Sequence, residues 1–193
     1  MQGRTIGFAM CGSFCSIDQT IPALKALVSD GYNVIPIFSE KAASTDTRFG
    51  RADEFVNMVQ GITGNGVIKT ITEAEPIGPK KLLDALIIAP CTGTTLSRIA
   101  SGLADTAVSL ACKAHIRNLR PVVIGVSTND ALCGNAQSLG RLLARKHFYF
   151  VPFRQDDPFG KPCSMMSDMT LIPEALKSAL GGEQLQPLVL GNA

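Results

Sequence analysis

The stretch Leu86-Ile87-Ile88-Ala89-Pro90-Cys91-Thr92-Gly93-Thr94-Thr95, which runs on to Asp105, decides the fold. It predicts a buried strand over residues 86–89, a tight polar loop over 90–94 and a helix that begins near Thr95. A helix N-terminus offers unpaired N–H groups and a partial positive charge, so threonine hydroxyls beside it could bind a phosphate. The same pattern also fits an ordinary strand–loop–helix turn with capping threonines, and both interpretations stand at this point.

Strands and helices alternate on either side of this stretch. Strands are predicted at 5–10, 33–38, 121–126 and 148–151, and 67–72 could form a short additional strand. Pro36 favours either an edge position or a bulge for the second strand. Helices are predicted at 18–30, 53–60, 106–119, 135–145 and 173–180. Residues 154–167 look irregular and long enough for a functional loop.

This alternation predicts an α/β fold, a three-layer Rossmann-like (flavodoxin-like) parallel sheet with helices on both faces. About five strands are expected in the sheet. The length of 193 residues fits a single domain over 1–193, in which residues 181–193 form a C-terminal tail, either an arm or disordered.

Four polar loops follow predicted strands, at 11–16, 39–47, 90–95 and 127–131. They should converge, because parallel strands end at the same edge of a sheet. Hydroxyl-rich loops with few charges suit a neutral ring system with a phosphate tail. A magnesium nucleotide is disfavoured because no Walker lysine or paired carboxylates are present. Gly12 is the only glycine in the first loop, so the dinucleotide-binding fingerprint is absent.

Composition limits the classes of function. The net charge of +2 and the lack of a basic run argue against nucleic acid as a partner. No apolar run reaches membrane-spanning length and no signal peptide is recognised, so we expect a cytoplasmic protein without a membrane partner. Charged residues make up only 18% of the chain, which favours a surface partly covered by other subunits.

The six cysteines form no CxxC pair, and no metal site is expected. Cys11, Cys15 and Cys91 fall in the polar loops, either as reactive thiols or as small apolar filler. His115 and His147 are predicted at helix C-terminal ends, which leaves no Ser–His–Asp set. A bound cofactor would therefore carry any redox chemistry. Arg48 and Arg51 are either a solvated helix flank or a pair that binds carboxylates.

Several motifs resemble a known superfamily. The Gly12-Ser13 turn, the Ser39 strand exit, the loop at 89–95 and Gly102-Leu103-Ala104-Asp105 resemble the FMN-binding flavoproteins that include homo-oligomeric flavin-containing cysteine decarboxylases. Further motifs resemble the family of dipicolinate synthase B subunits over nearly the whole chain. These are Ser44–Gly50, Ala74–Pro79, Ile116–Val123, Ser127–Leu132 and Gln155–Phe159.

The resemblance implies FMN bound non-covalently by the four loops. The cofactor-binding residues it implies are Gly12, Ser13, Ser39, Thr45, Pro90, Thr92, Gly93, Thr95, Ser127, Thr128, Asn129 and Ala131. It also implies a homo-oligomer, a trimer or a dodecamer, that acts with an A subunit carrying the nicotinamide (NADP) domain. The pair would oxidise dihydrodipicolinate to dipicolinate in the mother cell of a sporulating bacterium. Arg48 and Asn129 are the expected residues for the dicarboxylate substrate.

Two features separate this chain from the decarboxylases. Residues 39–86 contain no histidine where those enzymes have an active-site histidine, and Ser127-Thr128-Asn129 replaces their Pro-Met-Asn motif. Cysteine decarboxylation and flavin prenylation are therefore weaker hypotheses than an oxidoreductase subunit. A non-catalytic scaffold subunit with a vestigial flavin site is the remaining alternative.

Overall fold

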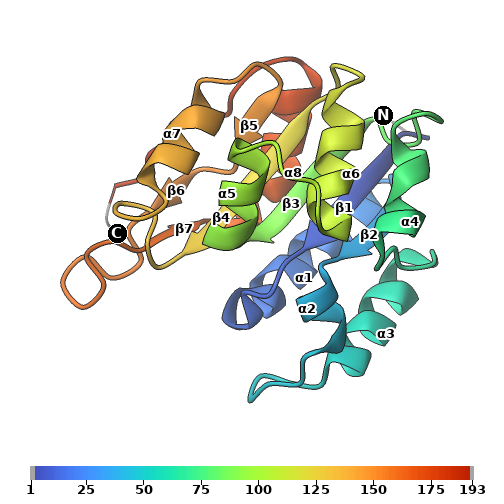
Figure 1. Ribbon diagram of the computed structural model, residues 1–193, viewed down its shortest axis with the longest axis horizontal. Helices are drawn as coiled ribbons and strands as arrows, with labels where there is room; N and C mark the ends of the chain where they lie inside the picture. Colours follow the sequence, from blue (N-terminus) through green and yellow to red (C-terminus); the bar gives the residue numbers. More distant parts are fainter. Residues whose placement is uncertain (1–2, 192–193) are drawn as a thin grey trace.

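The computed structural model describes residues 3–191, which form one mixed sheet between two layers of helices (Figure 1). Its strand order is β2-β1-β3-β4-β7-β6, and β5 also pairs with β4. The parallel strands are β1 (Thr5–Met10), β2 (Asn33–Phe38), β3 (Ala85–Cys91), β4 (Val122–Thr128) and β5 (Phe148–Phe150). Two short strands, β6 (Phe153–Arg154) and β7 (Met165–Ser167), add to it in antiparallel fashion.

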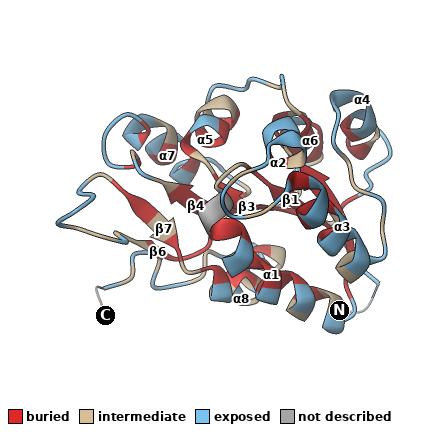
Figure 2. Cartoon of the chain, turned by 90° about the horizontal axis from the view of Figure 1, so that it is seen from below, coloured by how far each residue is buried: buried red, intermediate tan, exposed pale blue. Residues whose placement is uncertain are grey.

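Helices cover both faces of the sheet. One face carries α4 (Ile71–Ala74), α5 (Gly93–Ala100), α6 (Ala107–Ile116) and α7 (Ala136–Leu143), and the other carries α1 (Phe14–Ser29), α3 (Ala52–Thr63) and α8 (Ile172–Leu180). The short helix α2 (Glu40–Ser44) and the 3₁₀ turns η1 (Glu75–Ile77) and η2 (Met169–Leu171) complete the chain. Figure 2 shows the buried strands as the layer between these helices. The predicted three-layer α/β class is confirmed.

The central strand β3 shows why the sheet has two apolar faces. Leu86 and Ile88 belong to the core under α5 and α6, whereas Ile87 and Ala89 belong to the core over α1 and α8, and all four are fully buried. Side chains alternate across a strand, so a run without polar residues buries both faces at once. The edge position that Pro36 predicts is also confirmed, because β2 ends the sheet.

Two predicted elements are wrong in detail. Residues 67–72 contain only a single bridge from Ile68 to Ile37. Thr70 then starts helix α4 with a capping box to Glu73, since both side chains satisfy backbone N–H groups. The loop expected at 90–94 is partly strand: β3 continues through a bulge to Cys91, and Cys11 N donates to Pro90 O at 3.3 Å. Helix α5 therefore begins at Gly93 rather than near Thr95.

The segment that looks irregular at 154–167 is a hairpin. Its return strand β7 pairs with Ser127 and Thr128 at the end of β4, while β5 pairs with the beginning of β4. The Ser167 hydroxyl links β4 to the residue that follows β5, since it accepts from Val126 N and donates to Val151 O, both at 2.9 Å. The sheet is therefore continuous where β4 changes partner.

The segment after α8 returns to the sheet. The Gln184 side chain accepts from Phe150 N and donates to Phe150 O, both at 2.7 Å, and Val189 forms a parallel bridge with Phe153. These contacts cover the open side of β5 and β6. Among residues 3–191, no helix has the length and apolar character needed to cross a bilayer.

Candidate functional site

A pocket of about 1040 Å³ opens at the carboxyl edge of the parallel strands. Its walls come from the β1–α1 turn, the start of α5, the β4–α7 loop and the β6–β7 hairpin. The lining residues are Gly12, Ser13, Ser16, Thr92, Gly93, Thr94, Ser97, Ser127, Thr128, Asn129, Asp130, Asn135, Asp156 and Lys161 to Met166. The converging loops at this edge thus enclose one cavity large enough for a cofactor.

A cluster of three serine hydroxyls forms the floor of one end of the pocket. Ser127 Oγ lies 2.8 Å from Ser13 Oγ and 2.8 Å from Ser16 Oγ, and the hydroxyls of Ser13 and Ser16 are 3.3 Å apart. Ser13 is the N-cap residue of α1, a helix of 16 residues. Hydroxyl donors beside the N-terminus of a long helix suit a phosphate group. We call these residues the serine cluster.

A second polar network lies at the other end of the pocket, around Asp130. The carboxylate accepts from Thr128 Oγ1 and, at 2.7 Å, from Asn135 Nδ2. Ser97 Oγ in turn donates to Asn135 Oδ1. A Cβ atom on Gly93 would lie 2.5–2.7 Å from Asn135, Thr128 and Asp130, so any other residue there would displace these side chains. The network therefore depends on close approach of the α5 backbone.

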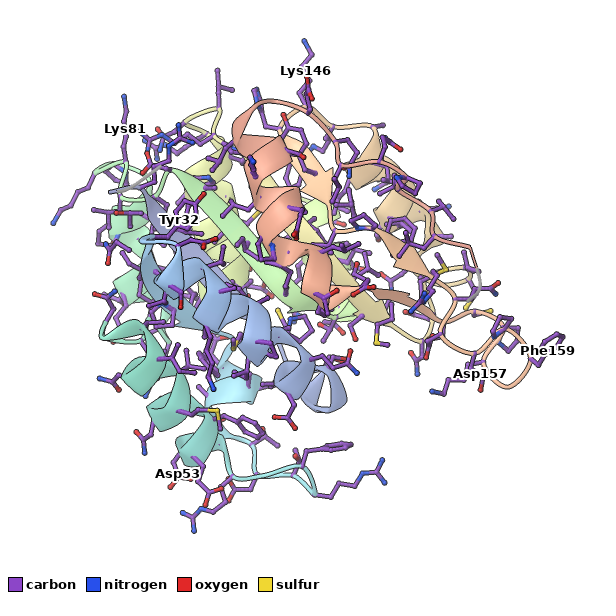
Figure 3. All side chains as sticks on the ribbon, turned by 180° about the vertical axis from the view of Figure 1, so that it is seen from behind. Tyr32, Asp53, Lys81, Lys146, Asp157 and Phe159 are labelled. Carbon is purple, nitrogen blue, oxygen red and sulfur yellow. The ribbon has the colours of Figure 1, made fainter. Side chains whose placement is uncertain are left out.

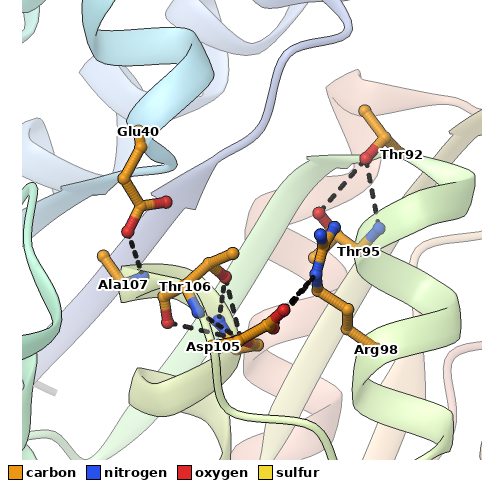
Figure 4. Close-up of polar contacts among 8 residues, drawn as sticks. Glu40, Thr92, Thr95, Arg98, Asp105, Thr106 and Ala107 are labelled. Carbon is orange, nitrogen blue, oxygen red and sulfur yellow. Dashed lines mark hydrogen bonds and ion pairs between the residues drawn. The ribbon is translucent and has the colours of Figure 1, made fainter.

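The start of α5 shows the ordinary capping arrangement. Thr92 Oγ1 accepts from Thr95 N at 3.3 Å and also bonds to Thr95 Oγ1 at 3.1 Å (Figure 4). The Asp130 carboxylate lies beside Gly93, so the positive end of α5 already faces a negative group of the same chain. The serine cluster at α1 is consequently the better place for a ligand's phosphate.

The charged side chains that line the described pocket are Asp130, Asp156 and Lys161. Lys161 Nζ lies 3.5 Å from Asp156 Oδ2. Desolvation opposes the charge on Asp156, but bonding to Ser164 and the nearby ammonium outweigh it and lower its pKa. Two carboxylates and one ammonium leave the lining net acidic, which disfavours an anionic substrate.

The two loop thiols that the structure describes are buried. Cys11 and Cys91 have at most 1% of their surface exposed, and burial raises the pKa of Cys11 to about 11 and that of Cys91 well above its ordinary value. A thiolate is the reactive form of cysteine, so both residues act as apolar filler in this chain. The Cys15 side chain lies outside the described part of the structure.

The comparisons with known proteins agree with this architecture. The Flavoprotein family matches residues 1–156. This chain belongs to the Flavoprotein family. It is 45% identical over 192 residues to the B subunit of dipicolinate synthase from Bacillus subtilis (strain 168), covering 100% of this chain and 96% of that protein. The resemblance recognised in the sequence is confirmed.

Solved structures extend the comparison. The crystal structure of the dipicolinate synthase B subunit from Bacillus halodurans is 40% identical, with a TM-score of 0.91 over 100% of this flavoprotein and 98% of that chain. DmrB of Burkholderia xenovorans, solved with FMN, is 14% identical with a TM-score of 0.68, over 92% of this chain and 96% of its own. At that identity the likeness concerns the fold alone.

The structure brings together most of the residues expected to hold the cofactor. Those that line the pocket of this flavoprotein are Gly12, Ser13, Thr92, Gly93, Ser127, Thr128 and Asn129. Pro90, Thr95 and Ala131 lie buried behind that surface. Ser39 caps α2 by accepting from Ala42 N at 3.2 Å, and Thr45 is exposed at the end of the same helix.

The arginine expected at the substrate lies apart from the pocket. Arg48 is exposed, and its guanidinium stacks over the Phe49 ring with 4.8 Å between Cζ and the ring centroid. Asp105, in the motif shared with the flavoproteins, accepts from Arg98 Nε at 3.0 Å rather than facing the cavity (Figure 4). The described residues contain no group of three potential metal ligands.

Sequence reasoning missed several lining residues. Ser16 belongs to a loop that the sequence did single out. Ser97 lies in α5 and Asn135 directly precedes α7, and nothing local marks either residue. The hairpin supplies Lys161 to Met166, and its length was the available signal. Figure 3 shows Asp157 and Phe159 at the far end of this hairpin, where the Phe159 ring is 98% exposed.

Proposed function

We propose that this flavoprotein is the B subunit of a dipicolinate synthase and holds FMN non-covalently in the pocket at the sheet edge. The observation that carries the proposal is the serine cluster, in which three hydroxyls from α1 and β4 meet beside the N-terminus of α1. The family and the two dipicolinate synthase relatives support the same assignment.

The residues present fit a flavin mononucleotide. The pocket volume of about 1040 Å³ exceeds what a cofactor of this size requires. Ser13, Ser16 and Ser127 would hold the phosphate, and the polar side chains of Thr128 and Asn129 would hold the ring system. Bound FMN would supply a two-electron acceptor, which no side chain of the lining can provide.

The proposed reaction is the oxidation of dihydrodipicolinate to dipicolinate with an A subunit that carries the NADP-binding domain. A dicarboxylate needs cationic partners, and the acidic lining around Asp130 and Asp156 offers only Lys161. Arg48 projects from the molecule and could supply a guanidinium to the pocket of a second copy, together with Asn129 of that copy. The proposal therefore includes a homo-oligomer, a trimer or a dodecamer, in the mother cell of a sporulating bacterium.

The acidic lining also favours a second candidate. No histidine lines the described pocket, and its carboxylates repel a dianion. In this alternative the chain is a scaffold for the A subunit and keeps a vestigial flavin site. The two candidates differ in whether FMN is retained and whether it is needed for dipicolinate formation.

The visible absorption spectrum of the purified chain separates them. After incubation with FMN and gel filtration, we expect flavin bands to remain with the protein, and riboflavin to be lost because it lacks the phosphate. Dipicolinate formation by the reconstituted pair of subunits should then require added FMN. Loss of both flavins, with full activity in the reconstituted pair, would establish the scaffold and exclude the flavin role.

A further inference from the structure

Two thiols meet at the rim of the pocket. Cys133 lies in the β4–α7 loop, and Cys163 lies on the return limb of the β6–β7 hairpin. The Cys133 thiol donates to Asp130 O at 3.6 Å and lies close enough to Cys163 to raise the pKa of that thiol. The backbone joins there as well, because Leu132 N donates to Cys163 O at 3.0 Å. The fold therefore holds two cysteines, distant in sequence, side by side across this backbone bond.

This pair differs from the other described thiols in its access to solvent. Cys11, Cys91 and Cys112 are buried, whereas Cys133 is exposed and Cys163 is half-buried. The neighbouring Cys133 thiol and partial desolvation raise the pKa of Cys163, which favours the protonated thiol there. A dissolved oxidant can reach both sulfur atoms of the pair.

The cysteine pair also lies at the wall of the pocket. Cys163, Ser164, Met165 and Met166 line the cavity. Ser164 Oγ donates to Thr128 O at 3.4 Å, and β7 adds only a short ladder to the end of β4. The return limb is thus held to the β4–α7 loop by a small number of hydrogen bonds, which local opening can break.

We propose that Cys133 and Cys163 form a reversible disulfide that fastens the return limb of the hairpin to the β4–α7 loop. Hydrogen peroxide is a sufficient oxidant. The two S–H bonds break and one S–S bond forms, while the two electrons cleave the peroxide O–O bond and two molecules of water leave. A dithiol reductant reverses the step by thiol–disulfide exchange. The inference rests on the adjacency and solvent access of the two cysteines and is independent of the proposed flavin.

Peptide mapping of the native chain after peroxide treatment tests the bond. Trypsin places Cys133 in the peptide 118–141 and Cys163 in the peptide 155–177, because Arg120 and Lys161 are each followed by proline. We expect these peptides linked to each other after oxidation and separate again after dithiothreitol. Amide hydrogen exchange over residues 163–167 should slow at least tenfold in the oxidised protein.

Matched variants give the controls. C133S and C163S should each abolish the link and the slower exchange, and both substitutions are mild because the two sites reach solvent. A mixture of unlabelled and ¹⁵N-labelled protein should give links within single chains only. Sulfinic acid at both cysteines without the link, a link that joins labelled to unlabelled chains, or unchanged exchange in the linked protein would overturn the proposal.

Discussion

The exits of β4 and β2 carry similar hydroxyl-rich sequences but use them differently. At the β4 exit, Ser127 bonds to Ser13 and Ser16 on α1, more than 100 residues away in sequence. At the β2 exit, Ser39 caps its own helix at Ala42, and Ser44 Oγ donates to Glu40 O at 2.7 Å. A hydroxyl that satisfies its neighbouring backbone stabilises a turn, whereas hydroxyls that meet from distant segments enclose a site.

The two exits also differ in their charged groups. Glu40 at the β2 exit accepts from Ala107 N at 2.9 Å and so supports the N-terminus of α6 (Figure 4). Asp130 at the β4 exit instead organises the Thr128 and Asn135 side chains at the pocket. We therefore expect the β2 exit to support the scaffold and the β4 exit to contact a ligand.

The largest expected effect comes from Gly93→Val, which removes the close approach on which the β4 exit depends. The new side chain must displace Thr128, Asp130 and Asn135, at an expected cost of about 3 kcal/mol in the free energy of unfolding. Flavin retention should be lost as well. The matched Gly140→Ala substitution in α7 meets nothing within 4 Å and should leave stability equal or slightly higher. Urea unfolding measures the stability of both variants. Equal stability of the two would contradict the dependence of the β4 exit on Gly93.

Acidification tests the C-terminal end of α6, the helix whose N-terminus the β2 exit supports. His115 is buried there and its Nε2 donates to Pro121 O at 3.0 Å. Burial lowers its pKa from 6.5 to about 4, so the folded state binds fewer protons than the unfolded state between these values. The contribution of neutral His115 to the free energy of unfolding is fully present above pH 6.5. The free energy of unfolding should fall by about 2 kcal/mol on going to pH 5.

Urea unfolding at pH 7 and pH 5 measures this loss. His115→Gln should remove most of the difference between the two pH values, because the titrating group is gone. His147→Gln, the matched change at the second histidine of the chain, should keep the wild-type difference. An identical pH dependence in all three proteins would mean that other groups cause the loss.

A smaller effect is expected from removing single hydroxyls, one at each of the two exits. Ser127→Ala removes the shared partner of Ser13 and Ser16, and we expect FMN affinity to fall about tenfold, or about 1.4 kcal/mol. Thr45→Ala at the β2 exit should leave FMN affinity unchanged in a single subunit. Fluorescence titration of FMN measures both constants. An equal loss in Thr45→Ala would show that the β2 exit also reaches the cofactor, as the resemblance implies.

The smallest effect concerns the motif at Asp105. Its ion pair with Arg98 is largely exposed, since the two side chains keep 32% and 57% of their accessible surface. Such pairs contribute less than about 1 kcal/mol, so Asp105→Asn should change the midpoint of urea unfolding only slightly. A larger loss, reversed by added FMN, would instead assign Asp105 to the cofactor site.

The sequence was sufficient wherever short-range patterns decide the structure. The strands at 5–10 and 33–38 are found at their predicted bounds, because apolar runs between turn residues leave little choice of register. The end of β3 was missed because the proline at position 90 looks like a strand terminator, although a bulge carries the strand on to Cys91. The same limit applies to the pocket: Ser13 and Ser127 follow predicted strands, but Asn135 and the hairpin enter through contacts that no local pattern encodes.

The ladder between β4 and β7 has a consequence for how this family can diversify. β7 pairs with Ser127 and Thr128 through the backbone, so the hairpin is anchored by its main chain, and this pairing does not depend on the side chains beyond the anchor. Insertions or replacements between Gln155 and Pro162 would leave the register of the sheet intact. The hairpin is thus an exchangeable module, and grafting it between relatives would transfer one wall of a pocket without redesigning the domain beneath it.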